Sequence, residues 1–311
     1  MSAARRGATG LAGVLAIDKP SGMTSHDVVS AIRRSTGERR IGHAGTLDPA
    51  ATGLLVVLIG PATRLAPFLT SASKSYRARI AFGAQTDTDD ADGAVIGTSE
   101  VPSALVDAAY AARMVAALVG DHLQVPPAYS AIKRGGTTAH RAARAGAPLD
   151  LEPRPVTVID SRLVSVQAAP AVSWEIEVTV SKGTYVRALA RDLGRSCGTV
   201  AHLAALRRLS SGNLTITDAS TLEDAVDRGS DPSGLFADPV RALGLPVRAV
   251  SAEEARSVRV GAAIPAGDLE KASPGTPVAV ADADRLYAVY EYASDTATLK
   301  PGAVLAGGVA R

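Results

Sequence analysis

The feature that most constrains the fold is a two-residue alternation of apolar and polar side chains, which occurs twice. In KSYRARIAFG, residues 74–83, Tyr76, Ile80 and other apolar residues alternate with arginines. In SWEIEVTVSKG, residues 173–183, Trp174 begins a second apolar face. Side chains point to opposite faces of a strand at successive residues, so this period predicts two half-buried strands.

Helical patterns lie before and after these strands. Residues 25–37, SHDVVSAIRRSTG, follow Thr24, and Asp27 stands where a capping box requires an acid. Residues 184–198 predict a second helix, and VAHLAALRRL, residues 200–209, predicts a third. Strands occur before and between helices without regular alternation. The predicted fold class is therefore α+β, with a mixed, mainly antiparallel sheet flanked by helices and loops.

The 311 residues predict more than one domain, because domains cluster at about 100–150 residues. Residues 1–12 are expected to form a disordered N-terminal tail. Residues 13–240 are expected to form the main domain, in which 229–239 look like a linker. Short β-like runs recur in residues 246–311 and predict a small β-rich domain.

Composition excludes several classes of protein. The single cysteine, Cys197, rules out an internal disulfide framework and a multi-cysteine metal site, and it fits a reducing, cytoplasmic compartment. The longest apolar run, residues 54–60, is much shorter than the roughly 20 residues of a membrane span. The chain contains no phosphate-binding loop, no dinucleotide fingerprint, no zinc-protease motif and no nucleophile elbow.

One acidic stretch, DTDDADG at residues 87–93, approaches a calcium-binding loop. Counted from Asp87, the fifth position is Ala91, the sixth is Asp92 and the twelfth is Thr98. A calcium loop of this type requires a ligand, a glycine and a glutamate at these positions. The stretch is therefore interpreted as a hairpin turn whose carboxylates accept hydrogen bonds from backbone amides.

The stretch GHAGTLDPAATGLL, residues 42–55, contains one carboxylate, Asp48, directly before Pro49. Taken alone, Asp-Pro is typical of a turn. The same residue could be the centre of a reaction. The motif by itself does not separate these two interpretations.

Four segments together resemble the TruB family, the bacterial tRNA pseudouridine-55 synthases. They are IDKPSGMTSHDVV, RIGHAGTLDPAATGLL, KSYRARIAFG with TDTDDADG, and SKGTYVRALARDLG, with LRRL downstream. The resemblance extends from about Gly13 to Leu209. Residues 246–311 look like a small PUA-like RNA-binding domain.

The resemblance implies that the chain isomerises uridine to pseudouridine in the T arm of tRNA. Uracil must leave the ribose through N1, turn over and rejoin through C5. Nothing is oxidised, hydrolysed or phosphorylated, so the family requires neither a cofactor nor a metal, and one carboxylate can suffice. The expected partner is tRNA, with no membrane and no small-molecule cofactor. We expect a monomer.

The resemblance also assigns roles to the predicted catalytic residues. Asp48 would attack the sugar or base, or remove the 2′ proton in a glycal route. Arg187 would pair with that carboxylate and keep it ionised and oriented. Tyr76 would stack on the extruded uracil, and its hydroxyl is a candidate for removing the C5 proton. The alternatives are a surface arginine and a core tyrosine.

Further residues match positions near the flipped nucleotide. His43 is expected beside it, while Tyr185 and Leu206 are expected to contact the uridine; Leu206 could instead be helix core. The family carries an RNA-binding thumb insertion at about residues 127–152. This segment is locally basic, which by itself fits either a polyanionic partner or an ordinary solvated surface. The expected phosphate contacts are Lys133, Arg134, Arg141 and Arg144.

Three other functions compete with this assignment. One is a related synthase that modifies a different RNA. Another is an RNA-binding protein that keeps the fold without catalysis, although Asp48, Tyr76 and Arg187 are all present. The third is a metal-dependent nuclease, which would require clustered acids, and the only such cluster is DTDDADG.

Overall fold

Residues 9–269 and 272–311 are described by a computed structural model. Most of the predicted tail, residues 1–12, lies outside these ranges. At the start of the first of these ranges, the Thr9 amide donates to Glu38 Oε2 at 2.9 Å. The chain divides into two compact units. The first unit comprises Met1–Ala72 and Ser210–Arg311, and the second unit comprises Ser73–Leu209.

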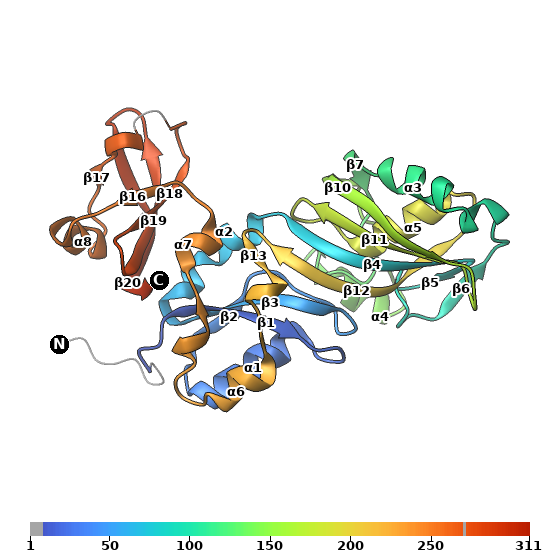
Figure 1. The fold of residues 1–311 in the computed structure, drawn as a ribbon, viewed down its shortest axis with the longest axis horizontal. Helices are drawn as coiled ribbons and strands as arrows, with labels where there is room; N and C mark the ends of the chain where they lie inside the picture. Colours follow the sequence, from blue (N-terminus) through green and yellow to red (C-terminus); the bar gives the residue numbers. More distant parts are fainter. Residues whose placement is uncertain (1–8, 270–271) are drawn as a thin grey trace. The chain divides into compact units, whose positions relative to one another are not determined.

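The sheet of the first unit is built around β1 (Gly13–Lys19). This strand pairs along its length with antiparallel β3 (Thr52–Ile59) and on its other side with parallel β14 (Ser220–Thr221). Two short strands extend this sheet, β2 (Ile41–His43) beside β3 and β15 (Phe236–Ala237) beside β1. Helices α1 (Ser25–Thr36) and α6 (Leu222–Asp227) lie side by side (Figure 1). The first unit also contains several short elements before its C-terminal part: η1 (Gly60–Leu65), α2 (Ala66–Ser71), β13 (Leu214–Thr215), η3 (Ile216–Asp218), η4 (Ser233–Leu235) and α7 (Pro239–Leu243).

Helix α1 has the ends that the sequence predicts. Thr24 Oγ1 accepts from the Asp27 amide, and the Thr24 amide donates to the Asp27 carboxylate, so the capping box is complete. Gly37 ends the helix in the left-handed conformation with φ 70°, and its amide donates to the Arg33 carbonyl. Val28, Val29 and Ile32 form the apolar face of this helix and are buried.

The C-terminal part of the first unit forms a separate five-stranded sheet, ordered β16-β18-β19-β20-β17. Its elements are β16 (Val247–Ala249), α8 (Ala252–Arg259), β17 (Ile264–Pro265), η5 (Gly267–Leu269), β18 (Pro277–Ala281), β19 (Arg285–Ala293) and β20 (Thr298–Ala310). Leu286 and Val309 share a hydrophobic cluster with Leu65 of η1. Tyr290 packs with Val258 of α8 in a second cluster. The predicted β-rich character of residues 246–311 is confirmed.

The predicted linker at residues 229–239 is wrong in part. Within it, β15 joins the sheet of the first unit, with Val14 opposite Ala237 and Leu15 opposite Phe236. Asp238 then caps α7 by accepting from the Val240 amide at 2.8 Å. Glycine and proline indicated a loop, but backbone pairing with β1 fixes two of these residues.

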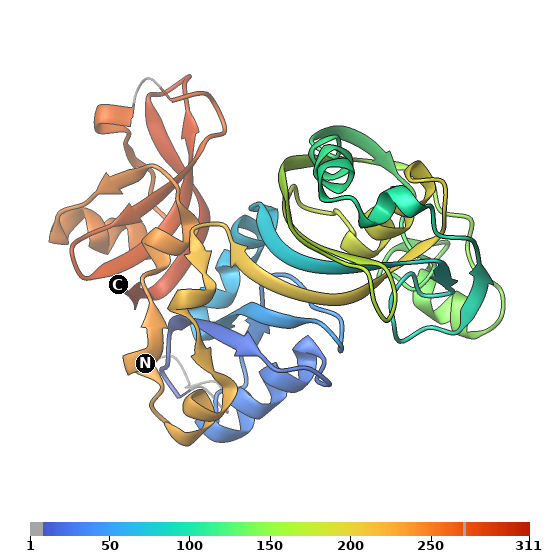
Figure 2. The same ribbon diagram turned by 45° about the vertical axis from the view of Figure 1, so that its right-hand side comes forward.

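The second unit contains the two alternating strands, β4 (Lys74–Phe82) and β11 (Ser173–Val180), as antiparallel neighbours. The order of its sheet is β12-β4-β11-β10-β7, and Figure 2 shows how strongly the sheet curves. The other strands are β7 (Gly120–Gln124), β10 (Arg154–Gln167) and β12 (Ala201–Ser211). Trp174 and Ile80 are fully buried while Arg79 is exposed, so the predicted alternation is confirmed.

Helices α3 (Ala108–Ala116) and α5 (Val186–Ser196) cover the buried face of this sheet. Trp174 of β11 packs edge-on against Tyr110 of α3, and Leu118, Leu189 and Val156 line one pocket. The smaller elements are β5 (Ala84–Thr86), β6 (Val95–Thr98), η2 (Ser103–Val106), β8 (Lys133–Arg134), β9 (Thr137–Thr138) and α4 (Ala139–Arg144). In the described part of the chain, no helix has the length and apolar character needed to span a membrane.

The predicted helix at residues 200–209 is wrong, because these residues form strand β12. Alanine, leucine and arginine favour helices in isolation, but that preference amounts to a few tenths of a kcal/mol per residue. Pairing within a sheet outweighs it. Leu206 is therefore a half-buried strand residue and not a helix-core residue.

Candidate active site

Asp48 lies in an irregular turn of the first unit between β2 and β3. The turn closes with a hydrogen bond from the Ala51 amide to the Asp48 carbonyl at 3.1 Å. Its neighbour Leu47 is buried, whereas Asp48 is half-buried, so the carboxylate stands at the edge of the core. His43 precedes this turn as the last residue of β2, opposite Val57, and is also half-buried.

Two buried polar residues brace this turn. The Lys19 ammonium, which is 0% exposed, donates to the carbonyls of Pro49, Pro20 and Met23 at 3.1, 2.8 and 2.6 Å. Ser25 Oγ accepts from the Leu47 amide at 2.9 Å. These bonds satisfy backbone groups on both sides of Asp48, and a buried ammonium is tolerated where carbonyls replace its water. The turn is consequently held in one conformation.

Tyr76 lies on β4 of the second unit, opposite Val178 of β11, and is 8% exposed. It shares a face with Ala78, Ile80 and Phe82, all of which are buried. The orientation predicted from the alternation is therefore correct. A ring that is mostly covered but still reaches the surface can present an edge or face to a base.

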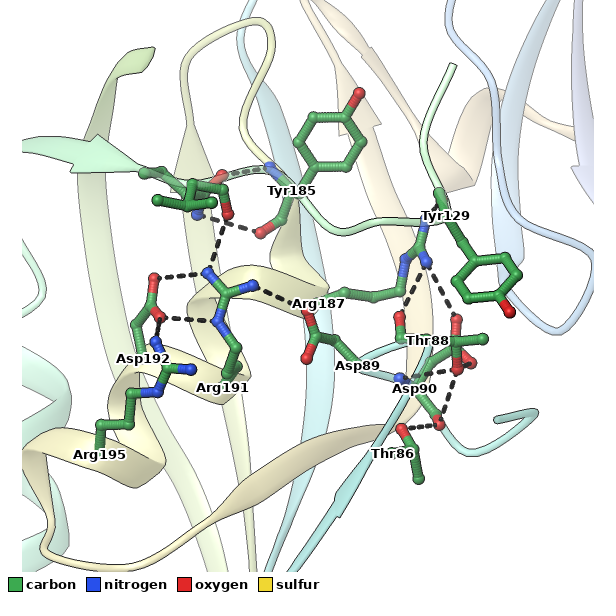
Figure 3. Close-up of polar contacts among 12 residues, drawn as sticks. Thr86, Thr88, Asp89, Asp90, Tyr129, Tyr185, Arg187, Arg191, Asp192 and Arg195 are labelled. Atoms are coloured by element: carbon green, nitrogen blue, oxygen red, sulfur yellow. Dashed lines mark hydrogen bonds and ion pairs between the residues drawn. The ribbon is translucent and has the colours of Figure 1, made fainter. Parts of the chain in front are cut away.

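Arg187 lies in the first turn of α5 and is 6% exposed. Its Nη1 donates to the Thr88 carbonyl at 3.0 Å, and its Nη2 donates to the Tyr129 carbonyl at 2.9 Å. Nη1 is also 3.5 Å from Asp90 Oδ2 (Figure 3). The predicted surface-helix alternative is excluded, because the guanidinium is buried and fixed by backbone oxygens.

The acidic turn at residues 87–93 is structural in the way the sequence predicts. Asp87 Oδ1 accepts from the Ala94 amide at 2.8 Å, and Asp90 Oδ1 accepts from the Asp92 amide at 3.1 Å. Asp89 adopts a left-handed conformation with φ 61°. Among the described residues, no three histidine, cysteine or carboxylate side chains are grouped so that they could hold a metal ion.

The sequence did not indicate the buried ion pair between Asp89 and Arg191, one turn after Arg187 on α5. Arg191 Nη1 donates to Asp89 Oδ2 at 2.8 Å, and Nη2 donates to the Val125 carbonyl at 2.8 Å (Figure 3). Burial raises the pKa of the Asp89 carboxyl, and the guanidiniums of Arg191 and Arg187 oppose that effect. The four-residue spacing of the two arginines places them on one face of α5, and it is the one sequence signal from which a shared role could have been inferred.

Tyr185 directly precedes α5 and is half-buried. Its amide donates to Gln124 Oε1 at 2.9 Å, and Gln124 Nε2 donates to its carbonyl at 3.2 Å. Gln124 thus holds the Tyr185 backbone as a neighbouring strand would. The second unit brings together Arg187, Asp90 and the backbone of Tyr129.

The predicted thumb insertion forms the hairpin β8–β9 and helix α4. All four cations expected to contact phosphates are exposed on these elements: Lys133, Arg134, Arg141 and Arg144. Arg134 bonds the Asp150 carbonyl and lies 3.8 Å from Glu152. The exposed positions agree with a surface that meets a polyanion.

Of the predicted site residues, Asp48 and His43 belong to the first unit, and the remainder belong to the second. Pairing of Asp48 with Arg187 and Tyr76 stays a prediction.

Comparison with known proteins identifies the family. Residues 33–186 match the model of the TruB family pseudouridylate synthase N-terminal domain, and residues 187–240 match that of the tRNA pseudouridylate synthase B C-terminal domain. The tRNA pseudouridine synthase B of Nocardia farcinica is 46% identical over 84% of this chain and 84% of that protein. The enzyme of the same name from Arthrobacter sp. strain FB24 is 45% identical over 86% of each chain.

A solved structure resembles the chain as well. A chain of the Cbf5–Nop10–Gar1 complex superposes with a TM-score of 0.71 at 25% identity, covering 94% of this chain and 84% of that one. The α+β fold class with a PUA-like C-terminal domain is therefore confirmed. The chain belongs to the TruB family of pseudouridylate synthases.

Proposed function

We propose that this chain converts uridine-55 in the T arm of tRNA into pseudouridine. The observation that carries the proposal is the 46% identity, over 84% of both chains, to a relative named tRNA pseudouridine synthase B. The proposed catalytic domain is residues 13–240, and residues 246–311 are proposed to bind RNA as a PUA-like domain. The protein is proposed to act as a monomer in the cytoplasm.

The reaction breaks one C–N bond and forms one C–C bond within the same nucleotide. The T-loop uridine is first flipped out of the RNA, because its C1′ and C5 are otherwise covered. Asp48 is the proposed catalytic carboxylate, either as a nucleophile or as the base that removes the 2′ proton. The bracing by Lys19 and Ser25 supports this role, since a fixed carboxylate loses little entropy in reaching its target.

The other residues are proposed to bind and orient the nucleotide. Tyr76 stacks on uracil and is the candidate acceptor of the C5 proton, while Arg187 holds Asp48 ionised. His43 occupies the space beside the flipped nucleotide, and Tyr185 and Leu206 contact the uridine. The four exposed cations of the 127–152 insertion are proposed to bind phosphates, which position RNA without reading its sequence.

The test uses T-arm RNA labelled with tritium at uracil C5. Forming the C1′–C5 bond displaces that hydrogen, so the wild-type protein should release the label to water without added metal. Asp48→Asn, which keeps the size of the side chain, should release none. Release that persists in Asp48→Asn would overturn the catalytic assignment, and no release by the wild type would overturn the function. Other structured RNAs, tested in parallel, distinguish a synthase with a different substrate.

A further inference from the structure

Two arginines on successive turns of α5 form hydrogen bonds with the same two segments of the second unit. Arg187 bonds Thr88 and Tyr129, and Arg191 bonds Asp89 and Val125. Each guanidinium thus holds one group in the acidic turn at residues 87–93 and one carbonyl in residues 125–129. The latter segment contains the first residues of the 127–152 insertion. An arginine fork suits this task, because its donors diverge in a fixed plane (Figure 3).

The Asp89 backbone determines where its two neighbours point. Thr88 and Asp90 are the turn residues that meet Arg187, and Asp89 between them has a φ of 61°. Residues other than glycine are uncommon in this conformation, although aspartate and asparagine adopt it more readily than most, so contacts of the Asp89 side chain and backbone determine how well the turn is fixed. The Asp89 side chain is held by Arg191, and its carbonyl accepts from the Leu203 amide at 3.0 Å. The ion pair therefore helps to fix the positions of Thr88 and Asp90, the two turn residues that contact Arg187.

Burial distinguishes this pair from the Arg195–Asp192 pair on the next turn of the helix. The side chains of Arg191 and Asp89 are 9% and 8% exposed, whereas those of Arg195 and Asp192 are 62% and 42% exposed. Exposed pairs contribute little to stability or geometry. A buried pair adds little net stability over apolar residues, but it strongly restricts the geometry of both partners. Its effect is therefore expected in the placement of groups more than in the folding free energy.

We propose that Arg191 and Asp89 are positioning residues, which hold Arg187 and the base of the 127–152 insertion in the arrangement that isomerisation requires. The inference rests on the proposed function. Arg191 acts through Asp89 and the Val125 carbonyl, and it is not among the residues proposed to contact the uridine. We expect a displacement of Arg187 on the order of 1 Å to slow the reaction without removing an RNA contact.

The experiment measures single-turnover tritium release as a function of RNA concentration. Arg191→Met leaves the Asp89 carboxylate buried without its partner, so a second variant combines Arg191→Met with Asp89→Asn. In this double variant no buried charge is stranded, and the thermal midpoint should return close to the wild-type value. Asparagine also tolerates the left-handed conformation. The control, Arg195→Met, removes an exposed arginine from the next turn of α5.

We expect both Arg191→Met and the double variant to lower the rate at saturating RNA by about 10- to 100-fold. The RNA concentration at half-maximal rate should change less than about twofold, the signature of a lost positioning contact. Arg191→Lys keeps the charge without the fork and should be intermediate. Arg195→Met should match the wild type. If Arg191→Met does not fold, the saturating rates of the double variant and of Arg191→Lys decide whether the pair positions Arg187.

Wild-type rates in the double variant would show that the pair serves stability alone and would overturn the inference. A higher half-maximal RNA concentration with an unchanged saturating rate would also overturn it, because that result indicates RNA binding. Equal slowing by Arg195→Met would indicate a general effect on the helix and contradict the proposal. An inactive wild type would refute the proposed function, and this inference with it.

Discussion

At the scale of single residues, buried cations fix the conformation of loops. Lys19, Arg187 and Arg191 are each less than 9% exposed, and each donates to backbone carbonyls of segments distant in sequence. Placing a charge in the interior is unfavourable unless oxygens replace the lost water. A cation in this setting therefore specifies one loop conformation, because any other conformation would leave it without acceptors.

Lys74 shows the electrostatic consequence of such burial. It is 7% exposed at the start of β4, and burial, together with the charge of Arg208, lowers its pKa from 10.5 to about 8. The unfolded chain binds more protons than the folded one between these values, so the free energy of unfolding should rise with pH across this window. Below pH 8 the lysine is charged in both the folded and the unfolded state, so the folded protein bears the full free-energy cost of burying the charged ammonium.

The prediction compares the wild type with Lys74→Met by urea unfolding from pH 7 to 10.5. The stability of the wild type relative to the variant should rise by roughly 3 kcal/mol over that range, which is the free energy of the pKa shift. Lys182→Met removes an exposed lysine of the same unit and serves as the control. A constant difference between wild type and Lys74→Met at every pH would refute the prediction.

At the scale of elements, the sequence predicted the helices and strands that are specified by patterns among neighbouring residues. The box of Thr24 and Asp27, the alternation around Tyr76 and Trp174, and the strands of the C-terminal part all follow from neighbouring residues. Strand β12 was missed, because its residues favour a helix and only pairing with other strands determines its structure. The exposure of the insertion was predictable, whereas the contacts between 125–129 and α5 were not.

The site shows the same limit. Asp48 and Arg187 were identified from motifs, but the Asp89–Arg191 pair joins residues 102 positions apart, which no local pattern specifies.

The cap at the N-terminus of α1 can be tested directly. Thr24→Ala should lower the free energy of unfolding by about 1 kcal/mol, because the Asp27 amide loses its acceptor. Thr24→Ser keeps the hydroxyl and should stay near the wild type. Equal stability of the alanine and serine variants, by urea unfolding, would refute the cap.

At the scale of the whole molecule, the proposed function requires a surface that recognises RNA through its charge. Replacing Lys133, Arg134, Arg141 and Arg144 by alanine should weaken tRNA binding, and the slope of log affinity against log salt should fall by about one for each lost phosphate contact. The measurement is a filter-binding or fluorescence titration at several salt concentrations.

A matched control removes the same charge elsewhere on the second unit. It replaces four exposed arginines outside the insertion by alanine: Arg79, Arg113, Arg162 and Arg195. The salt slope should change much less in this variant. Equal slopes for the two quadruple variants would mean that net charge, and not the insertion, governs RNA binding.

Asp48 is proposed to catalyse the formation of pseudouridine at one position of tRNA. The most direct measurement incubates a full-length unmodified tRNA transcript with wild-type protein or Asp48→Asn and maps pseudouridine by carbodiimide labelling and primer extension. We expect modification by the wild type at position 55 alone and none by Asp48→Asn. Modification at other positions, or at position 55 by Asp48→Asn, would contradict the proposal.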